Sequence, residues 1–329
     1  MRRPGRPGPG MALALALALA LVTCAETQTG SGPPERRVVA REWDVAFTVG
    51  GAADTTLADI GYVAAGADRV IVYDEGRRTI VGFDTTGAVT WRVGREGRGP
   101  NEFSNIRAVV LSPDGRVAAL DRGNGRISLI EDGAIIRRIP IVATGPSDGM
   151  IVGRERFTLV ANGDPPLLEI DRDGASLGGH GYPHVVADVD GMATQPVIAG
   201  TPDAWALAFV FGGGWIASPT GRFEDAYYRD LVADPGFPVV ESTESGSRLV
   251  DAEKVVEAIS LSGDTVFIHG YDRSEKQGYL DLFALEDGEY LGSWRLPPPA
   301  ARAYRSSVSG EFVAIVEADP SPTLIVYRR

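Results

Sequence analysis

The sequence predicts an all-β protein built from a repeated unit, and three observations support this prediction. Short runs of apolar and β-branched residues alternate with turn pairs of the Asp-Gly and Asn-Gly kind, which are typical of hairpins. Helical periodicity is weak almost throughout the 329 residues, which include 41 glycines and 22 prolines. The strand pattern also recurs along the chain, so we expect a series of similar antiparallel sheets.

The clearest unit lies between residues 89 and 139. After a glycine-rich elbow at 94–103, four apolar runs follow, joined by Ser-Pro-Asp-Gly, Arg-Gly-Asn-Gly and Asp-Gly; they lie at 106–111, 116–121, 126–130 and 134–139. Four strands in this order form one antiparallel meander. A single sheet of this size cannot bury its apolar face unaided, so it needs neighbouring copies.

Such copies are present. RVIVYD at 69–74 matches RVAALD at 116–121 with an offset of 47 positions, and RFTLVA at 156–161 is a third copy. Weaker copies lie within residues 205–217, 264–288 and 312–327. Four-stranded repeats of about 40–50 residues are typical of a β-propeller.

The ends of the chain predict how the ring closes. Residues 324–327 are only the third strand of their repeat, whereas the run WDVAFTV at 43–49 has no repeat of its own. If this N-terminal strand completes the last blade, six blades of four antiparallel strands result and no sheet edge stays open. Residues 250–258 are the best helical candidate, and we expect a short helix or an irregular insertion there.

The runs GREGRGPNEF at 94–103 and SPDGRVAALDRGNGRISLIEDG at 112–133 resemble the NHL-type repeat of six-bladed β-propellers, within the TolB-like propeller superfamily. That repeat also has a glycine-rich loop ending in an aromatic residue, an Asp closing the second strand and Arg-Ile opening the third. The resemblance is specific over 91–133 and weaker over 59–90. It implies the six-bladed architecture.

The N-terminus predicts export. Three arginines precede an apolar run of twelve residues at 11–22, which is too short to span a bilayer as a helix and is typical of a signal peptide. The run ends in Leu-Val-Thr-Cys, which resembles a bacterial lipobox, and Cys24 is the only cysteine. We therefore predict a lipoprotein signal peptide at 1–23 and lipidation of Cys24; the alternative is an ordinary signal peptide with an incidental cysteine.

The domain plan follows from composition. Residues 24–40 are polar and rich in Gly, Pro and Thr, and are expected to form a flexible tether, while 41–329 form the propeller. Because Ala25 is not the Asp that often marks inner-membrane retention, we expect an outer-membrane lipoprotein in the bacterial cell envelope, facing the periplasm.

Charge restricts the partners. The chain has 32 basic and 44 acidic residues, and removing the three signal arginines leaves 29 basic residues. This acidic balance argues against nucleic acid and against an anionic membrane surface, so we expect membrane attachment through the lipid anchor only.

The polar residues concentrate in segments that the topology assigns to one end of the ring. In a meander, second-to-third turns and links between blades lie at the same end, around the mouth of the central channel. We predict a ligand site at this mouth, formed by Arg95, Arg98, Asp121, Arg122, Asn124, Asp164, His269, Asp272 and Arg273. The structural alternatives are that Asp74 and Asp121 cap turns and that each arginine pairs with a nearby acid.

No catalytic or metal-binding motif is recognisable. His180, His184 and His269 are the only histidines, and three histidines can ligate zinc, as in the six-bladed peptidyl-hydroxyglycine lyases. Six-bladed lactonases hold calcium with Glu, Asn and Asp, but no residue here matches that pattern. We predict no cofactor and no metal, with calcium or zinc required only if the chain is an enzyme.

The sequence therefore favours an envelope-anchored propeller that acts as a binding or scaffolding module for a peptide, glycan or protein partner. The alternative is a metal-dependent, lactonase-like hydrolase or lyase with its site in the central channel. A third interpretation is a structural subunit that docks through its blade edges. Fold alone does not decide among these functions.

Overall fold

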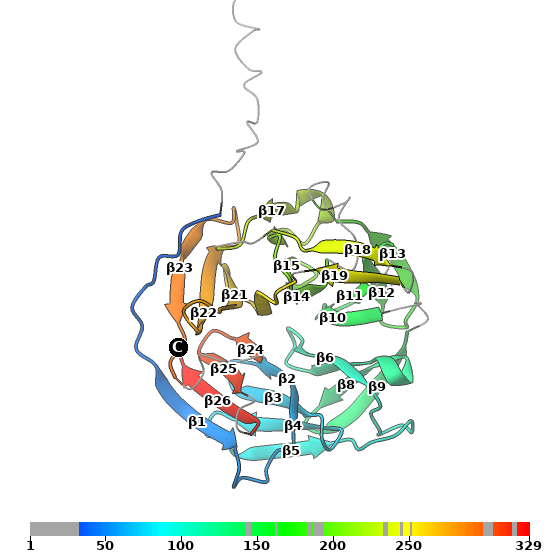
Figure 1. The fold of residues 1–329 in the computed structure, drawn as a ribbon. Coiled ribbons are helices and arrows are strands. Elements are labelled where there is room, and N and C mark those ends of the chain that lie inside the picture. Colours follow the sequence, from blue (N-terminus) through cyan, green and yellow to red (C-terminus); the bar gives the residue numbers. More distant parts are fainter. Residues whose placement is uncertain are drawn as a thin grey trace, which may run out of the picture.

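The computed structural model describes residues 33–141, 146–161, 164–182, 186, 194–232, 236–243, 246–250, 252–298, 305–317 and 321–329, with no side-chain description at 146–148, 242–243, 246–247 and 305. Within these ranges, six antiparallel four-stranded sheets stand as blades around a central axis (Figure 1). The prediction of an all-β, six-bladed propeller is confirmed. No helix in the described ranges is long and apolar enough to cross a membrane.

Blades one to three follow the chain in simple order. The first blade comprises β2 (Ile60–Ala65), β3 (Arg69–Asp74), β4 (Thr79–Asp84) and β5 (Val89–Val93). The second comprises β6 (Ile106–Leu111), β7 (Val117–Asp121), β8 (Arg126–Glu131) and β9 (Ala134–Pro140), with the short 3₁₀ turn η1 (Arg122–Asn124) after β7. The third comprises β10 (Pro146–Val152), β11 (Arg156–Ala161), β12 (Leu167–Asp171) and β13 (Ser176–His180).

The remaining blades include one insertion. The fourth blade comprises β14 (Pro196–Thr201), β15 (Ala204–Phe209), β16 (Trp215–Ser218) and β17 (Tyr227–Arg229), with η2 (Phe223–Asp225) before β17. A separate hairpin, β18 (Val239–Thr243) and β19 (Gly246–Val250), follows. The fifth blade comprises β20 (Val256–Ser262), β21 (Thr265–Asp272), β22 (Gln277–Ala284) and β23 (Tyr290–Arg295), and the sixth comprises β24 (Arg305–Val308), β25 (Phe312–Glu317), β26 (Thr323–Arg328) and β1 (Asp44–Gly50).

The predicted turn chemistry explains the hairpins. Asp132 and Gly133, between β8 and β9, have φ of 46° and 79°, as a two-residue turn with positive φ at both positions requires. A bulky or β-branched residue would be strained at either position. The Asp-Gly pair therefore sets the position of this hairpin, as the sequence predicts.

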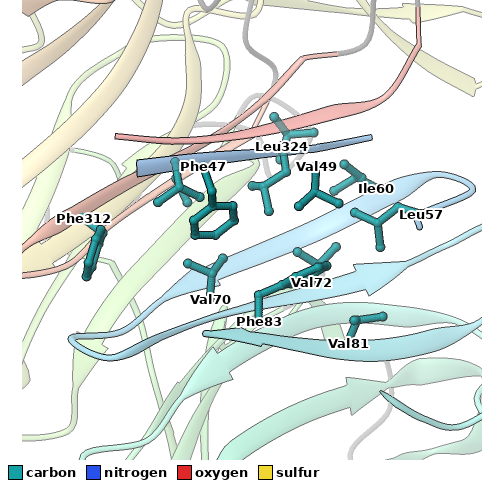
Figure 2. Close-up of a cluster of buried hydrophobic side chains, with 13 residues drawn as sticks. Phe47, Val49, Leu57, Ile60, Val70, Val72, Val81, Phe83, Phe312 and Leu324 are labelled. Carbon is teal, nitrogen blue, oxygen red and sulfur yellow. The ribbon is translucent and has the colours of Figure 1, made fainter. Parts of the chain in front are cut away.

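Ring closure occurs as predicted. Strand β1 pairs antiparallel with β26, from Asp44 opposite Arg328 to Gly50 opposite Thr323. Figure 2 shows Phe47 and Val49 of β1 beside Leu324 of β26, facing side chains of the first blade such as Val72. The N-terminal strand therefore supplies apolar side chains to the core between the last and the first blade.

The chain before β1 is partly docked. Val38 forms a parallel bridge with Ser293 of β23, where the Val39 amide donates to the Ser293 carbonyl at 2.8 Å. The Arg36 guanidinium forms ion pairs of 3.2 Å with both Asp272 and Asp281. The 24–40 segment was expected to be a flexible tether, but over 36–39 it is held against the fifth blade because backbone pairing and a partly buried ion pair fix it.

Of the two alternatives for 250–258, the short helix is wrong, and residues 252–255 have no regular secondary structure. The described residues from 252 onwards lead into strand β20, which starts at Val256 and forms the inner edge of the fifth blade. The amides of Val255 and Val256 donate to the carbonyl of Val210, at 2.9 and 3.1 Å. These β-branched residues favour an extended backbone, and the pairing with β21 decides the structure.

Candidate functional site: the central channel

A cavity of about 490 Å³ lies on the axis of the ring. Its lining residues come from β2, β6, β10, β14, β20 and β24, which are the innermost strands of the six blades (Figure 1). Every blade therefore contributes to one shared wall. A volume of this size falls in the range of roughly 300–1,000 Å³ that is usual for ligand sites.

The wall of this cavity is mostly aliphatic. Val63, Val110 and Ile198 are examples of half-buried apolar side chains along it, and hydroxyl groups lie between them. Two of these hydroxyls connect neighbouring inner strands, because Ser307 accepts from the Ala65 amide at 2.9 Å and Ser260 accepts from the Val308 amide at 3.0 Å. The hydroxyls therefore help to hold the ring closed at its centre.

One charged residue, Glu257, occurs among the described residues that line the channel. Its side chain is 13% exposed and forms an ion pair with Lys254. Tyr62 is the one other titratable side chain in the described lining, and the remaining lining residues are apolar or carry hydroxyl groups. The channel is therefore chemically suited to holding a largely apolar group with a few hydrogen bonds.

The cavity reaches the end of the ring opposite the predicted mouth. Pro113, Thr201 and Gly263, at or beside first-to-second turns of their blades, belong to its lining. The nine residues predicted as a ligand site lie outside this lining. Sequence reasoning placed them at the other end because their segments are the second-to-third turns and blade links.

The glycine-rich elbow is held towards the outside of the second blade. Arg138 of the outer strand β9 donates to the carbonyl of Pro100 at 2.6 Å, and Arg126 donates to the carbonyl of Gly99 at 2.8 Å. Arg95 pairs with Glu102 at 2.8 Å and has a side chain that is 78% exposed. The backbone amide of Gly99 and then Arg95 lower the pKa of Glu102. Arg95 therefore has an acidic partner within the elbow.

Asp121 and Asn124 form hydrogen bonds that connect the glycine-rich elbow to the turn after β7. Asp121 is fully buried and accepts from the amides of Ser104 and Asn105, at 3.2 and 3.0 Å, and from the Asn124 amide and side chain. Asn124 also donates to the carbonyl of Gly97 at 3.1 Å. These bonds join the elbow to the β7–β8 turn, as the turn-capping alternative predicts.

Asp272 and Arg273 belong to a different cavity, of about 240 Å³, beside the fifth blade. Asp272 accepts from the amides of Ser274 and Glu275 and pairs with Arg36, while Arg273 pairs with Glu253 at 3.0 Å. Burial raises the pKa of Asp281, on the floor of this cavity, and the Arg36 charge opposes that effect. Arg36 completes this site, although the sequence placed it in the tether.

The other predicted residues are dispersed. Arg98, Arg122 and Asp164 have exposed side chains. His269 is 1% exposed, and neither ring nitrogen has a hydrogen-bond partner in the described structure. Burial and then the charge of Lys254 lower the pKa of His269 to about 3, so its imidazole is neutral at neutral pH.

The two described histidines, His180 and His269, have different surroundings and do not share a site. His180 contacts Glu169 at 3.2 Å and stacks on Phe223 with ring centroids 3.7 Å apart, whereas His269 is buried in the fifth blade. His184 lies outside the described residues. Across the part of the chain that the structure describes, no group of three or more His, Cys, Asp or Glu side chains could hold a metal ion.

Sequence reasoning missed Glu257 because a short helix or an irregular insertion, and not a strand, was expected at 250–258. The alternation of apolar and polar residues from Ile259 to Ser262 was the available signal for a strand. Glu317, at the end of β25, is another residue that the sequence analysis does not single out. It is 5% exposed, and its Oε1 has no hydrogen-bond partner in the described structure.

No protein-family model and no curated protein sequence matches this chain. Solved structures do resemble it. A member of the duf4221 family from Bacteroides vulgatus has a TM-score of 0.55 at 11% identity, with 90% of this chain and 98% of that chain covered. Selenomethionine-substituted virginiamycin B lyase from Staphylococcus aureus has a TM-score of 0.54 at 12% identity, with coverages of 88% and 100%.

A structure described as streptogramin B lyase is similar to the same degree, with a TM-score of 0.52, 12% identity and coverages of 86% and 98%. At these identities the likeness shows the propeller fold and leaves the ligand and the chemistry to the site itself.

Proposed function

We propose that this chain is a binding or scaffolding module of the bacterial cell envelope, which holds a partner at its central channel without transforming it. The observation that carries this proposal is the channel wall, in which six inner strands present aliphatic side chains and hydroxyls around one ion-paired acid, Glu257. Such a wall binds apolar groups by removing them from water.

A peptide is the favoured ligand class. Tyr62 is the one aromatic residue among those that line the cavity, whereas glycan sites usually rely on stacked aromatic rings. An extended peptide segment can insert an aliphatic side chain among residues such as Val63 and Ile198 and use the serine hydroxyls for its backbone. A protein partner could present this segment as a loop.

The envelope location rests on residues 1–24, which lie outside the described structure. The basic N-terminus, the apolar run at 11–22 and the single Cys24 support an exported lipoprotein. The outer membrane, facing the periplasm, is the proposed site of attachment. The NHL-type resemblance of the elbow region supports membership of a propeller group that binds partners, and it stays part of this proposal.

A channel-filling variant tests the proposal. Ala258 lines the cavity and is half-buried, so Ala258→Trp should occupy the space without opening the fifth blade. A panel of short peptides rich in aliphatic residues is screened by thermal shift. We expect peptides that raise the melting temperature of the parent to lose this effect on Ala258→Trp. The matched control is Leu177→Trp, on the outer strand β13, where the side chain is 54% exposed.

The same screen separates the alternatives. If peptides stabilise Ala258→Trp and the parent equally but lose their effect on Arg95→Ala/Arg98→Ala, the site is the elbow and the channel proposal is wrong. Hydrolysis of an ester or lactone that is abolished by a chelator would favour the metal-dependent enzyme. Loss of that hydrolysis in Glu257→Gln would place the reaction in the channel.

A further inference from the structure

Two arginines lie over one buried tryptophan on the outer rim, between the fifth and sixth blades. The Arg41 guanidinium carbon lies 4.2 Å from the ring centroid of Trp294, and that of Arg329 lies 5.5 Å from it. In Figure 1 the segment before β1 runs along the outside of the ring past the C-terminal end. Residues near both ends of the chain therefore meet at this position.

Aromatic rings surround the two guanidinium groups. Arg41 also lies 5.4 Å from the Trp43 ring, and Arg329 lies 4.8 Å from the Phe267 ring. These rings attract a cation through their faces and hold the planar guanidinium group. The rings accept no conventional hydrogen bond, and the buried Nε of Arg41 has no partner among the described residues, whereas Arg329 is exposed to solvent.

Neither guanidinium has an acidic partner among the residues that the structure describes. In the described ranges, no carboxylate forms an ion pair with Arg41 or Arg329, although Glu42, Asp44 and Glu311 are close in the chain or the sheet. Arg41 Nε is buried and has no hydrogen-bond partner there. Arg36, by contrast, is partly buried and has acceptors in Asp272 and Asp281.

The two charges also oppose each other. Burial, followed by the positive charge of Arg329, lowers the pKa of Arg41, and burial lowers the pKa of Arg329. Two like charges over one ring are unfavourable unless an anion lies between them. Although the chain has 44 acidic residues, no described carboxylate forms an ion pair with either guanidinium.

We infer that Arg41 and Arg329 form a binding site for a phosphate group, with Trp43, Trp294 and Phe267 as its aromatic support. Two guanidinium forks from different segments match a tetrahedral dianion better than a single carboxylate, because phosphate offers several acceptor oxygens and about two negative charges. The ligand is a phosphate monoester or a phospholipid headgroup. This site is independent of the central channel.

The test uses the full chain with Cys24→Ala, so that no acyl chain binds vesicles. Inorganic phosphate and glycerol phosphate are titrated at constant ionic strength, with sodium chloride as the balancing salt. Because Trp294 lies beside both arginines and Trp43 lies beside Arg41, tryptophan fluorescence reports binding directly. We expect Arg41→Gln and Arg329→Gln each to weaken binding at least tenfold, and Arg41→Lys to weaken it less.

Arg95→Gln is the control, because Arg95 is an exposed arginine with its own acidic partner in the elbow. It should bind phosphate as the parent does. Co-sedimentation with phosphatidylglycerol and phosphatidylcholine vesicles is the second arm. Binding of free phosphate identifies a soluble ester as the ligand, whereas binding only to phosphatidylglycerol, lost in Arg41→Gln/Arg329→Gln, identifies a lipid headgroup. The inference is overturned if neither probe binds, or if the double variant binds as tightly as the parent.

Discussion

Acidic residues end the second strands of four blades, at Asp74, Asp121, Asp272 and Glu317, yet their surroundings differ. Asp74 accepts from the amides of Ala58 and Asp59, at 3.1 and 3.2 Å, and Asp121 accepts from the corresponding link before its own blade. Glu317 ends β25 in the same way but has no such acceptor role in the described residues. Burial alone raises the pKa of Glu317 to about 7.

This difference predicts a pH-dependent stability. An unfolded glutamate ionises near its ordinary pKa of 4.5, whereas folded Glu317 stays protonated up to about 7. The unfolded state therefore binds fewer protons between these values, and the free energy of unfolding falls as pH rises from about 4.5 to about 7. Glu317→Gln removes this loss, so at pH 8 the variant should be more stable than the parent by about 1–3 kcal/mol.

Urea unfolding at pH 5 and pH 8 measures this effect. The two proteins should have closely similar stability at pH 5, because Glu317 is protonated there in the folded state. Glu311→Gln serves as the control, since Glu311 is exposed and its replacement should change little at either pH. A Glu317→Gln protein that gains nothing between pH 5 and pH 8 would show that Glu317 has an ionised partner in solution.

Asp121, in contrast to Glu317, is a buried carboxylate whose two oxygens accept several hydrogen bonds. Asp121→Ala leaves the amides of Ser104, Asn105 and Asn124 without their acceptor, and we expect a loss of about 2–4 kcal/mol in the free energy of unfolding. Glu131→Ala, which removes an exposed pair with Arg116, should cost less than about 1 kcal/mol. Similar losses in the two variants would argue that the elbow does not depend on Asp121.

At the scale of elements, β1 has the greatest effect on the ring. It completes the last blade although it is about 280 residues distant from β26 in sequence, and its two faces have different roles. Phe47 is 8% exposed and stacks beside Phe83 of the first blade, with ring centroids 6.4 Å apart, whereas Val45 is 57% exposed. The inward face of this strand therefore joins the last blade to the first.

Two substitutions in β1 test this role. Phe47→Ala should lower the free energy of unfolding by about 3–5 kcal/mol, because it leaves a cavity between the blades. Val45→Ala, on the outward face of the same strand, should cost less than about 0.5 kcal/mol. Urea unfolding followed by tryptophan fluorescence compares them. Equal losses would mean that β1 contributes strand pairing but little inter-blade packing.

At the scale of the whole molecule, closure places the N-terminal segment on the outer rim of the ring (Figure 1). Residues 36–39 are docked on the fifth blade, so the expected tether to Cys24 is at most the segment 25–35. At about 3.5 Å per residue, it allows the propeller to stand up to roughly 40 Å from an anchor. If Cys24 is lipidated as predicted, such a tether would let the ring present either end to a partner.

The anchor itself remains a prediction. Cys24→Ala should convert a membrane-bound protein into a soluble periplasmic one, because stable attachment needs the acyl chains carried by a lipidated cysteine. Fractionation of cells that express each form measures the change. A Cys24→Ala protein that still sediments with membranes would show that another part of the chain holds it there.

The sequence by itself determines the blades of this protein and the closure of the ring. Hairpins depend on residues close in the chain, such as Asp132 and Gly133, and a repeat offset of 47 positions reveals how often the hairpins recur. The unpaired strand at 43–49 then has one place to pair. These features are local or periodic, and local features can be predicted from a single sequence.

Only the tertiary structure decides which side chains meet. The sequence predicts that Arg95, Asp272 and His269 share a mouth, but the elbow turns outward, Asp272 faces Arg36 and His269 is buried. The channel wall is formed by inner strands of six blades, and no segment contains more than one of them. Arg41 and Arg329 meet over Trp294 from distant parts of the chain. Such contacts arise from the packing of blades, which sequence spacing does not encode locally.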